Sequence, residues 1–484
     1  MEEFDVVIVG GGPAGSTAAS LVSMQGHRAL ILEKEKFPRY QIGESLLPST
    51  VHGICRLIGA WDALAQVGFT RKNGATSRWG INPEPWTFTY PDSPKMAYQT
   101  SYAYHVERMK FDQIMLDNAR RLGAEVRECC SAKSVLESNG RVCGVRYTDG
   151  DGAEREVSGK FVVDASGNGS RLYRHAGGLR QYSDFFRSVA LFGYFDGGKR
   201  LPEPNSGNIL SVAFESGWFW YIPLSDTLTS VGAVVRDDMA AKIQGDPESA
   251  LASLIEECPM VSDYLSGAKR ITTGEYGRLR VRKDYSYHNT KFWRPGMVLV
   301  GDAACFIDPV LSSGVHLATY SALLAARSIN SILAGTVDEA RAFREFEARY
   351  RREYGVFYEF LLSFYDMNAS EGSYFWKAKK VTESSSSELA AFVELVAGIA
   401  SGESALIDAD DVAQRVKSAS TEFDNEGEQL VLDSEGSIMR LVRSPVIGPA
   451  LLAAAGHDDA KEEHPLYADG LVASPDGLLW SSPA

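Results

Sequence analysis

The hydrophobic positions at the start of the chain follow the pattern of a strand, a turn, a helix and a second strand. Asp5–Val9 is a short run of mostly β-branched apolar residues, as expected of a strand that is buried on both faces. Pro13–Gly26 carries small and apolar residues at helical spacing, and His27–Glu33 is a second apolar run that ends in an acid. The pattern therefore predicts one βαβ unit.

Further strands are predicted later in the chain. Within 125–164, the alternating run Arg141–Tyr147 and the apolar run Lys160–Asp164 flank a cluster of turn-forming residues. Within 186–236, alternating runs separated by Gly- and Pro-containing turns predict antiparallel strands of a second layer. Met297–Leu299 has the pattern of another buried strand.

Helical patterns dominate after these strands. Helices are predicted from about Gly314 to Ala334, over 338–366 and near 388–401. The second of these helices carries a repeating aromatic stripe, which we interpret as core packing, formed by Phe343, Phe346, Tyr350, Tyr354 and Phe357.

Composition places the chain among ordinary globular proteins. It has 484 residues, of which 44% are hydrophobic and 23% charged. The formal net charge of −14 argues against nucleic-acid binding and against docking on an anionic membrane. The six cysteines form no CxxC pair and no zinc-like spacing, so we expect free thiols, a cytoplasmic protein and no metal site. The N-terminus has no signal-peptide pattern, and apolar runs such as 391–400 are too short to span a bilayer.

The turn after the first strand has the glycine pattern of a dinucleotide-binding site. It reads Gly10-Gly11-Gly12-Pro13-Ala14-Gly15, follows a strand, opens a helix, and has Glu33 at the end of the next strand. Gly10 permits the tight turn, Gly12 lets the backbone approach a pyrophosphate, and Gly15 lets the helix pack closely on the strand. Pro13 and Ala14 complete the start of the helix, where an anion binds favourably. The alternative is a glycine-rich turn without a ligand.

This fingerprint does not distinguish NAD from FAD, but later segments do. The stretch 293–304, which contains Gly301 and Asp302, resembles the Gly-Asp segment of flavoproteins, whose aspartate contacts the ribityl chain. Val163–Gly167 resembles a further recurring stretch of that class. Arg108 stands where these proteins place an arginine near the cofactor, the alternative being a surface salt bridge. The resemblance implies FAD and a fold like that of p-hydroxybenzoate hydroxylase.

A tryptophan-rich stretch narrows the resemblance. Gly217–Pro223, with Trp218 and Trp220, is similar to the Trp-x-Trp-x-Ile-Pro motif of flavin-dependent halogenases. In that family the two indoles separate the substrate from the flavin and so block direct hydroxylation. The alternative is two aromatic residues that share one face of a strand, because side chains at i and i+2 point the same way.

The same family resemblance identifies a lysine as a candidate catalytic residue. Lys72 follows Gly43–Pro48, which also resembles the halogenases, although Arg71 is its direct neighbour. The resemblance implies that Lys72 holds a hypohalous acid or forms a haloamine with it. Lysine suits this task because its charge is compact and its pKa falls on burial. A solvated surface lysine is the alternative.

The segment Asp308–His316 resembles the halide and flavin segment of this family. The resemblance implies that Pro309 and Gly314 contact the flavin, and that backbone N–H groups near Ser313 and Gly314 bind the halide at a helix start. A serine N-cap is the plainer interpretation, and both are compatible. Tryptophan halogenases carry a glutamate where this chain has Leu311, which indicates a substrate that is already electron-rich, such as a phenol or pyrrole.

The resemblance implies a complete enzyme system. A partner flavin reductase supplies FADH2, and O2 and chloride or bromide are consumed to halogenate an aromatic small molecule or a carrier-protein-tethered aromatic. Three alternatives remain: an aromatic hydroxylase using NADPH, a flavin-dependent prenyl reductase, and a non-catalytic FAD-binding scaffold.

The expected fold class is α/β, in which a Rossmann-like FAD-binding domain carries an inserted antiparallel sheet and a mostly helical C-terminal region. The expected domains are an FAD-binding domain over 1–185 and 275–335, a substrate-side sheet over 186–274, and a helical region over 336–484 that serves as a lid.

Overall fold

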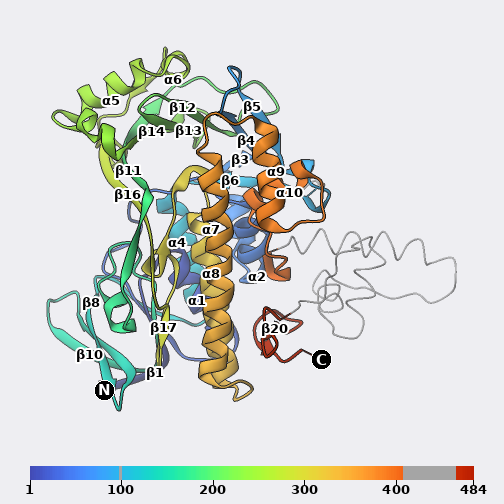
Figure 1. The fold of residues 1–484 in the computed structure, drawn as a ribbon. Coiled ribbons are helices and arrows are strands. Elements are labelled where there is room, and N and C mark those ends of the chain that lie inside the picture. The colour runs from blue at the N-terminus through green and yellow to red at the C-terminus, as the bar shows by residue number, and fades with distance from the viewer. Residues whose placement is uncertain (97–100, 407–464, 484) are drawn as a thin grey trace.

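The structure is a computed structural model that describes residues 1–96, 101–406 and 465–483. Two large β-sheets lie at opposite ends of the molecule, and helices α7 and α8 run between them (Figure 1). Within the described residues, no helix combines the length and the apolar character needed to cross a membrane. The part of the expected lid at 407–464 lies outside the described residues.

The first sheet is the predicted nucleotide-binding sheet. Its central strands are parallel in the order β18-β10-β1-β2-β7, and the βαβ pattern at the N-terminus is confirmed as β1, α1 (Pro13–Met24) and β2. The strands are β1 (Glu2–Val9), β2 (Ala29–Leu32), β7 (Glu125–Arg127), β8 (Ser131–Ser138), β9 (Arg141–Thr148), β10 (Glu154–Asp164), β17 (Trp293–Arg294) and β18 (Met297–Leu299). Parallel strands bring their carboxyl ends to one edge, where ligands of such sheets bind.

The second sheet is largely antiparallel and has the order β19-β16-β11-β14-β13-β12-β4-β5. Its strands are β4 (Gly74–Arg78), β5 (Trp86–Thr89), β11 (Arg180–Asp196), β12 (Ile209–Phe214), β13 (Gly217–Pro223), β14 (Leu228–Arg236), β15 (Lys269–Arg270), β16 (Arg280–Asn289) and β19 (Cys305–Phe306). The predicted antiparallel strands within 186–236 are confirmed. The sheet also takes β4 and β5, which the sequence analysis did not assign to it.

Each strand of the second sheet presents alternate residues to two different cores. On β13, Phe219 and Tyr221 pack in a small core with α5 (Pro247–Glu256) and α6 (Pro259–Tyr264). Trp218, Trp220 and Ile222 belong to the main core instead. Burial on both faces explains why this stretch reads as a continuous apolar run.

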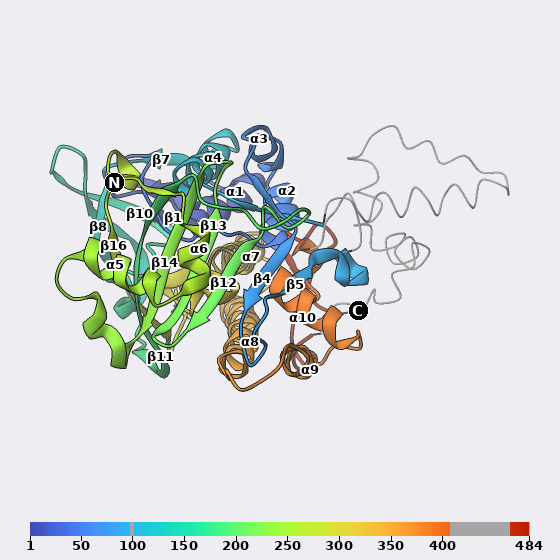
Figure 2. The ribbon, with the colours of Figure 1, turned by 90° about the horizontal axis from the view of Figure 1, so that it is seen from above.

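The predicted C-terminal helices are present. They are α7 (Gly314–Leu333), α8 (Glu339–Phe364) and α10 (Glu388–Ala397), and a further helix that was not predicted, α9 (Glu371–Thr382), lies between α8 and α10. The aromatic stripe of α8 is buried, which confirms its interpretation as core. Figure 2 shows α10 beside β5, so helices from the end of the chain meet strands from its beginning. The remaining elements are α2 (Cys55–Leu57), α3 (Trp61–Gln66), α4 (Arg108–Arg121), and the strand pairs β3 (Thr70–Lys72) with β6 (Ala103–His105) and β20 (Val472–Ala473) with β21 (Trp480–Ser481).

Candidate functional site

The glycine turn between β1 and α1 leaves room for a phosphate group. Gly10 has φ +105°, and a Cβ there would lie 2.5 Å from the Ala165 carbonyl oxygen. A Cβ on Gly15 would lie 1.9 Å from the Gly10 oxygen, so these positions need glycine. Helix α1 begins at Pro13 with no acidic residue in its first turn. Its free N–H groups and positive dipole end therefore suit an anionic pyrophosphate.

Glu33 follows β2 and lies beside the same turn. Its carboxylate is buried, and its two oxygens accept hydrogen bonds from the N–H groups of Gly11 at 2.6 Å and Glu35 at 2.9 Å. These bonds hold the acid rigidly at the end of the strand, where a dinucleotide's adenosine ribose is bound in sheets of this type.

The predicted cofactor residues Arg108 and Asp302 lie near each other on different elements. Arg108 makes a bidentate ion pair with Asp112, at 2.8 and 3.0 Å, and donates to the carbonyls of Ile42 and Gly43. Burial raises the pKa of Asp302 to about 6, against the lowering effect of Arg108. The guanidinium therefore holds the 42–43 loop in place, an arrangement that is not the surface salt bridge weighed above.

The segment before α7 forms a helix start with an orphan hydroxyl. The Asp308 carboxylate accepts hydrogen bonds from the Val310 N–H and the Tyr365 hydroxyl. Ser312 has φ +60°, so the chain turns sharply before Ser313 and Gly314 begin the helix. The Ser313 Oγ is buried and has no hydrogen-bond partner within the described residues. No acid stands in the first turn of α7, so this helix end is suited to an anion.

The two tryptophans of β13 lie on the inner face of the second sheet. The Trp220 indole N–H donates to the Ser230 hydroxyl at 3.1 Å, and its ring lies over Gly232, where a Cβ would come within 2.3 Å of it. The Trp218 ring is 6.2 Å from that of Trp220 and 6.1 Å from that of Trp79. The indoles therefore form a continuous aromatic wall.

Lys72 is a buried amine, unlike its neighbour Arg71. Its side chain reaches inward from β3, is 3% exposed, and donates to the Ser45 Oγ at 3.0 Å and the Leu46 carbonyl at 3.2 Å. Burial lowers the pKa of Lys72 to about 7. Arg71 is exposed and stacks over Tyr102 at 4.4 Å. The structure thus excludes a solvated surface position for Lys72.

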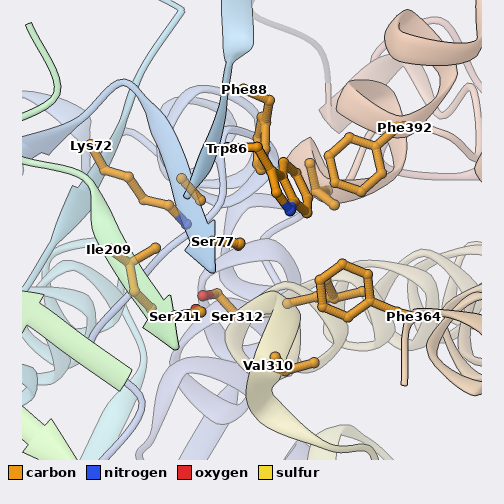
Figure 3. A pocket seen from close by; sticks show the side chains of 13 residues that line it. Lys72, Ser77, Trp86, Phe88, Ile209, Ser211, Val310, Ser312, Phe364 and Phe392 are labelled. Atoms are coloured by element: carbon orange, nitrogen blue, oxygen red, sulfur yellow. The ribbon is translucent and has the colours of Figure 1, made fainter. Parts of the chain in front are cut away.

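The Lys72 side chain lines a cavity on the inner face of the second sheet (Figure 3). The cavity encloses about 410 Å³, including its opening to solvent. Its lining is mostly aromatic and aliphatic, with three hydroxyls and one amine: Lys72, Ala75, Ser77, Trp86, Phe88, Ile209, Ser211, Val310, Leu311, Ser312, Phe364, Phe392 and Val396. A mostly apolar lining with a few polar groups is typical of sites that bind small aromatic molecules.

Strand register explains how distant residues share this cavity. Across the sheet, Trp220 pairs with Ser211, Ser211 with Ser77, and Ser77 with Trp86. Side chains paired directly across strands lie on the same face of a sheet. Trp220 is therefore in the same row as the floor of the cavity but is not one of the lining residues.

The structure places some of the predicted residues in the lining of one cavity and others, such as Trp218 and Trp220, outside that lining. Lys72 and Leu311 line one cavity, and the helix start at Ser313–Gly314 follows the lining residues Leu311 and Ser312 in the chain. Sequence reasoning missed the floor and the wall formed by Ser77, Trp86, Phe88, Phe364 and Phe392. The alternation Trp86-Thr87-Phe88-Thr89 was a usable strand signal. The two helical phenylalanines gave none, because core and cavity phenylalanines look alike in a sequence.

Comparisons with known proteins give consistent results. The family model described as tryptophan halogenase matches residues 5–95 and 89–434. A tryptophan 2-halogenase of Chondromyces crocatus is 36% identical over 380 residues, covering 78% of this chain and 70% of that protein. A 1H-pyrrole-2-carbonyl-[peptidyl-carrier protein] chlorinase of Pseudomonas fluorescens is 30% identical over 387 residues, covering 76% and 84%. The structure of the myxobacterial chondrochloren halogenase, a variant of FAD-dependent halogenases, matches with a TM-score of 0.76 and 47% identity, covering 99% of this chain and all of that one.

The nucleotide-binding sheet, the second sheet and these structural matches define an FAD-dependent enzyme with a fold like that of p-hydroxybenzoate hydroxylase. Within that class, the chain belongs to the tryptophan halogenase family and is a flavin-dependent halogenase. This result confirms the family, fold class, cofactor and enzyme class that the sequence predicts. The roles of the individual site residues and the domain boundaries stay predictions.

Proposed function

We propose that this enzyme halogenates an uncharged, electron-rich aromatic ring, a phenol or a pyrrole, with chloride as the preferred halide. The observation that carries the proposal is the cavity lining, in which Lys72 is the one charged side chain among the described residues. A free amino acid would bring an ammonium group that finds no carboxylate there. Burying an unpaired charge is costly, so the lining disfavours free tryptophan.

The lining also indicates how the ring is activated. Leu311 lines the cavity. By the family resemblance, it stands where the halogenases that act on tryptophan carry a glutamate. Without a carboxylate to stabilise positive charge on the ring, the ring must supply that stabilisation through its own hydroxyl or nitrogen. Ser77, Ser211 and Ser312 provide hydroxyls that are suited to hydrogen-bond such a group.

The residues present fit FAD and halide. Gly10, Gly12, Gly15 and Glu33 would hold the dinucleotide, and Ser313 with the α7 N-terminus would hold the halide. When bound and reduced by a partner reductase, FAD would pass two electrons to O2. The activated oxygen would then oxidise halide to hypohalous acid.

The chain's own residues then control where the oxidant goes. Trp218 and Trp220 form a wall that keeps the ring away from the flavin, so oxygen is not transferred directly. The Lys72 amine binds the hypohalous acid by a hydrogen bond and presents it to the ring. Burial keeps this amine near half-protonated at neutral pH, so it can both donate and accept a hydrogen bond.

One relative bears on whether the substrate is attached to a carrier protein. The pyrrole chlorinase that matches this chain acts on a substrate attached to a peptidyl-carrier protein. We therefore extend the proposal to carrier-tethered phenols and pyrroles, which reach the cavity through its opening.

The test uses the full chain with FAD, a flavin reductase, NADH, O2 and chloride. Free and carrier-tethered phenols and pyrroles are offered beside free tryptophan, and mass spectrometry records the chlorine isotope doublet. We expect the doublet with a phenol or pyrrole, its loss in Lys72→Ala, and its retention in Arg71→Ala, the outward-facing neighbour. A product heavier by one oxygen would identify a hydroxylase, and chlorinated free tryptophan would contradict the proposed substrate class.

A further inference from the structure

One buried carboxyl group has no part in the mechanism above. Glu44 is 2% exposed and lies between Gly43, held by Arg108, and Ser45, the hydrogen-bond partner of Lys72. A buried carboxyl beside two such contacts is a candidate for proton transfer.

Glu44 is connected to the surface by two phenols. The Tyr194 hydroxyl donates to the Glu44 Oε1 at 2.7 Å, and the hydroxyls of Tyr40 and Tyr194 are also 2.7 Å apart. Tyr194 is fully buried, whereas Tyr40 is partly exposed and lies under the Arg280 guanidinium at 3.5 Å. The three side chains form a continuous hydrogen-bonded chain from the partly exposed Tyr40 to the interior.

The inner end of this path lies beside the tryptophan wall. Tyr194 pairs with Ser230 across β11 and β14, so both hydroxyls lie on the inner face of the sheet. Ser230 accepts the Trp220 indole N–H. The second oxygen of Glu44, Oε2, makes no hydrogen bond within the described residues and so remains available to a further partner.

The charges around Glu44 keep its proton exchangeable near neutral pH. Burial raises the pKa of Glu44 to about 7, and Glu107 adds to this effect, whereas the hydroxyls of Ser230 and Tyr194 and the Arg108 guanidinium lower it. Tyr276 donates to Glu107, and Arg280 and Arg282 lower the pKa of Tyr40 at the outer end of the path.

The proposed reaction consumes a proton, for which such a path provides a route. Reducing O2 to two waters takes up four protons. The reduced flavin supplies two of them, and the aromatic ring releases one when its C–H bond is replaced by the carbon–halogen bond. The last proton must come from solvent, although the Trp218–Trp220 wall and Lys72 are buried.

We propose that Glu44 delivers this proton and is recharged from solvent through Tyr194 and Tyr40. The O–H bond of Glu44 breaks as an O–H bond forms on the oxygen that leaves as water. The Tyr194 hydrogen then moves to Glu44, the Tyr40 hydrogen to Tyr194, and a solvent proton to Tyr40. Burial raises the pKa of both tyrosines, so the hops are concerted and pass through no phenolate. The inference rests on the proposed function, since halogenation sets the proton balance.

The test compares Glu44→Gln and Tyr194→Phe with Tyr276→Phe. The Tyr276 ring lies 4.3 Å from that of Tyr194 at a tilt of 46°, but its hydroxyl donates to Glu107, so this control removes a neighbouring phenol and leaves the path intact. We expect kcat for halogenation to fall by about 10²-fold in Glu44→Gln and in the same direction in Tyr194→Phe. Lys72 also has a pKa of about 7, so the pH profile of kcat should contain two ionisations near pH 7 in the wild type and in Tyr276→Phe, and only one in Glu44→Gln.

A second measurement needs neither flavin nor turnover. Infrared spectra of the flavin-free chain at pH values around 7 should show a protonated carboxyl band that titrates and that is missing in Glu44→Gln. Wild-type kcat values in Glu44→Gln and Tyr194→Phe, or an equal loss in Tyr276→Phe, would overturn the relay. Should Glu44→Gln not fold, Tyr194→Phe decides. If the wild type makes no halogenated product, the proposed function fails, and the infrared titration still shows whether Glu44 exchanges a proton.

Discussion

At the scale of single residues, the buried ammonium group of Lys72 is unfavourable for the stability of the fold. Its ammonium has three hydrogens, but within the described residues it donates only to the Ser45 hydroxyl and the Leu46 carbonyl, and burial alone lowers its pKa. A buried amine without a carboxylate partner destabilises the fold whenever it is charged. Such a residue is retained for chemistry, because a hydrophobic residue would pack there at lower cost.

This unfavourable burial predicts a pH-dependent stability difference. The pKa of Lys72 is about 7 in the fold and 10.5 ordinarily, so its titration leaves stability unchanged above pH 10.5 and destabilises the fold increasingly as the pH falls toward 7. Lys72→Met should therefore raise the free energy of unfolding, by on the order of 4 kcal/mol at pH 7 and progressively less toward pH 10. Urea unfolding across this range measures the difference. Arg71→Met should show no such trend, and a pH-independent gain for Lys72→Met would contradict the argument.

The sequence predicts the identity of such residues better than their surroundings. The halogenase motifs single out Lys72, Trp218 and Trp220, and all three are buried on the inner side of the second sheet or beside it. Glu44 lies within the Gly43–Pro48 stretch, but no motif reveals its raised pKa, which comes from burial and Glu107 against the lowering effect of Ser230 and Tyr194, and the fold alone brings these groups together. A residue's environment depends on contacts between segments far apart in the chain.

At the scale of elements, hydrophobic periodicity predicts most helices and strands but not their partners. The helix expected from about Gly314 is α7, and the second-layer strands are β11 to β14. The parallel pairing of β4 with β12 could not be predicted, since it joins Ala75 to Ile209 across more than a hundred residues of intervening chain. This pairing matters because it adds β4 and β5 to the floor of the cavity.

A buried ion pair fastens α7 to the later chain. Arg327 on α7 makes a bidentate pair with Glu403 at 2.9 Å, both essentially unexposed, and its Nε–H donates to the Gly477 carbonyl. Removing one partner leaves the other charge buried, which costs about 3–5 kcal/mol. Glu403→Gln should therefore lower the thermal midpoint by several degrees, measured by calorimetry.

The matched control for this prediction is Glu347→Gln on α8. Glu347 pairs with Arg351 at 2.6 Å, but both side chains are partly exposed, at 20% and 34%. Exposed pairs contribute about 0–1 kcal/mol, so the midpoint should hardly move. Equal effects of the two substitutions would show that the Arg327 pair does not anchor the later chain.

At the scale of the whole molecule, the cavity is built from parts that the expected domain division separates. Its floor comes from 74–89 and from β12, its rim from 310–312, and its wall from α8 and α10. The side chains converge because the helices at the end of the chain pack against the strands near its beginning (Figure 2). Sequence patterns report periodicity along the chain, so they give no indication of which segments will surround a common space.

This convergence predicts that α10 takes part in substrate selection. Phe392 lines the cavity and lies 5.0 Å from Phe88 and 6.1 Å from Trp86, ring to ring. Phe392→Ala removes an aromatic side chain from the cavity lining. A small phenol therefore loses contact area, and its KM should rise about tenfold. Bulkier phenols should be affected less, because they fill the new space. Steady-state halogenation of a graded phenol series measures the KM values.

The control must separate the loss of the wall from the loss of packing, since truncating any buried phenylalanine destabilises the core by about 3–5 kcal/mol. Phe375 is partly buried, its ring lies 5.0 Å from that of Phe392 at a tilt of 50° and 5.8 Å from that of Trp86, and it is not among the cavity-lining residues. Phe375→Ala should therefore lower stability without changing the order of KM values across the series. If both variants change that order alike, the selectivity follows from the rigidity of α10. If only Phe392→Ala does, the end of the chain shapes the site in which its beginning places the catalytic amine.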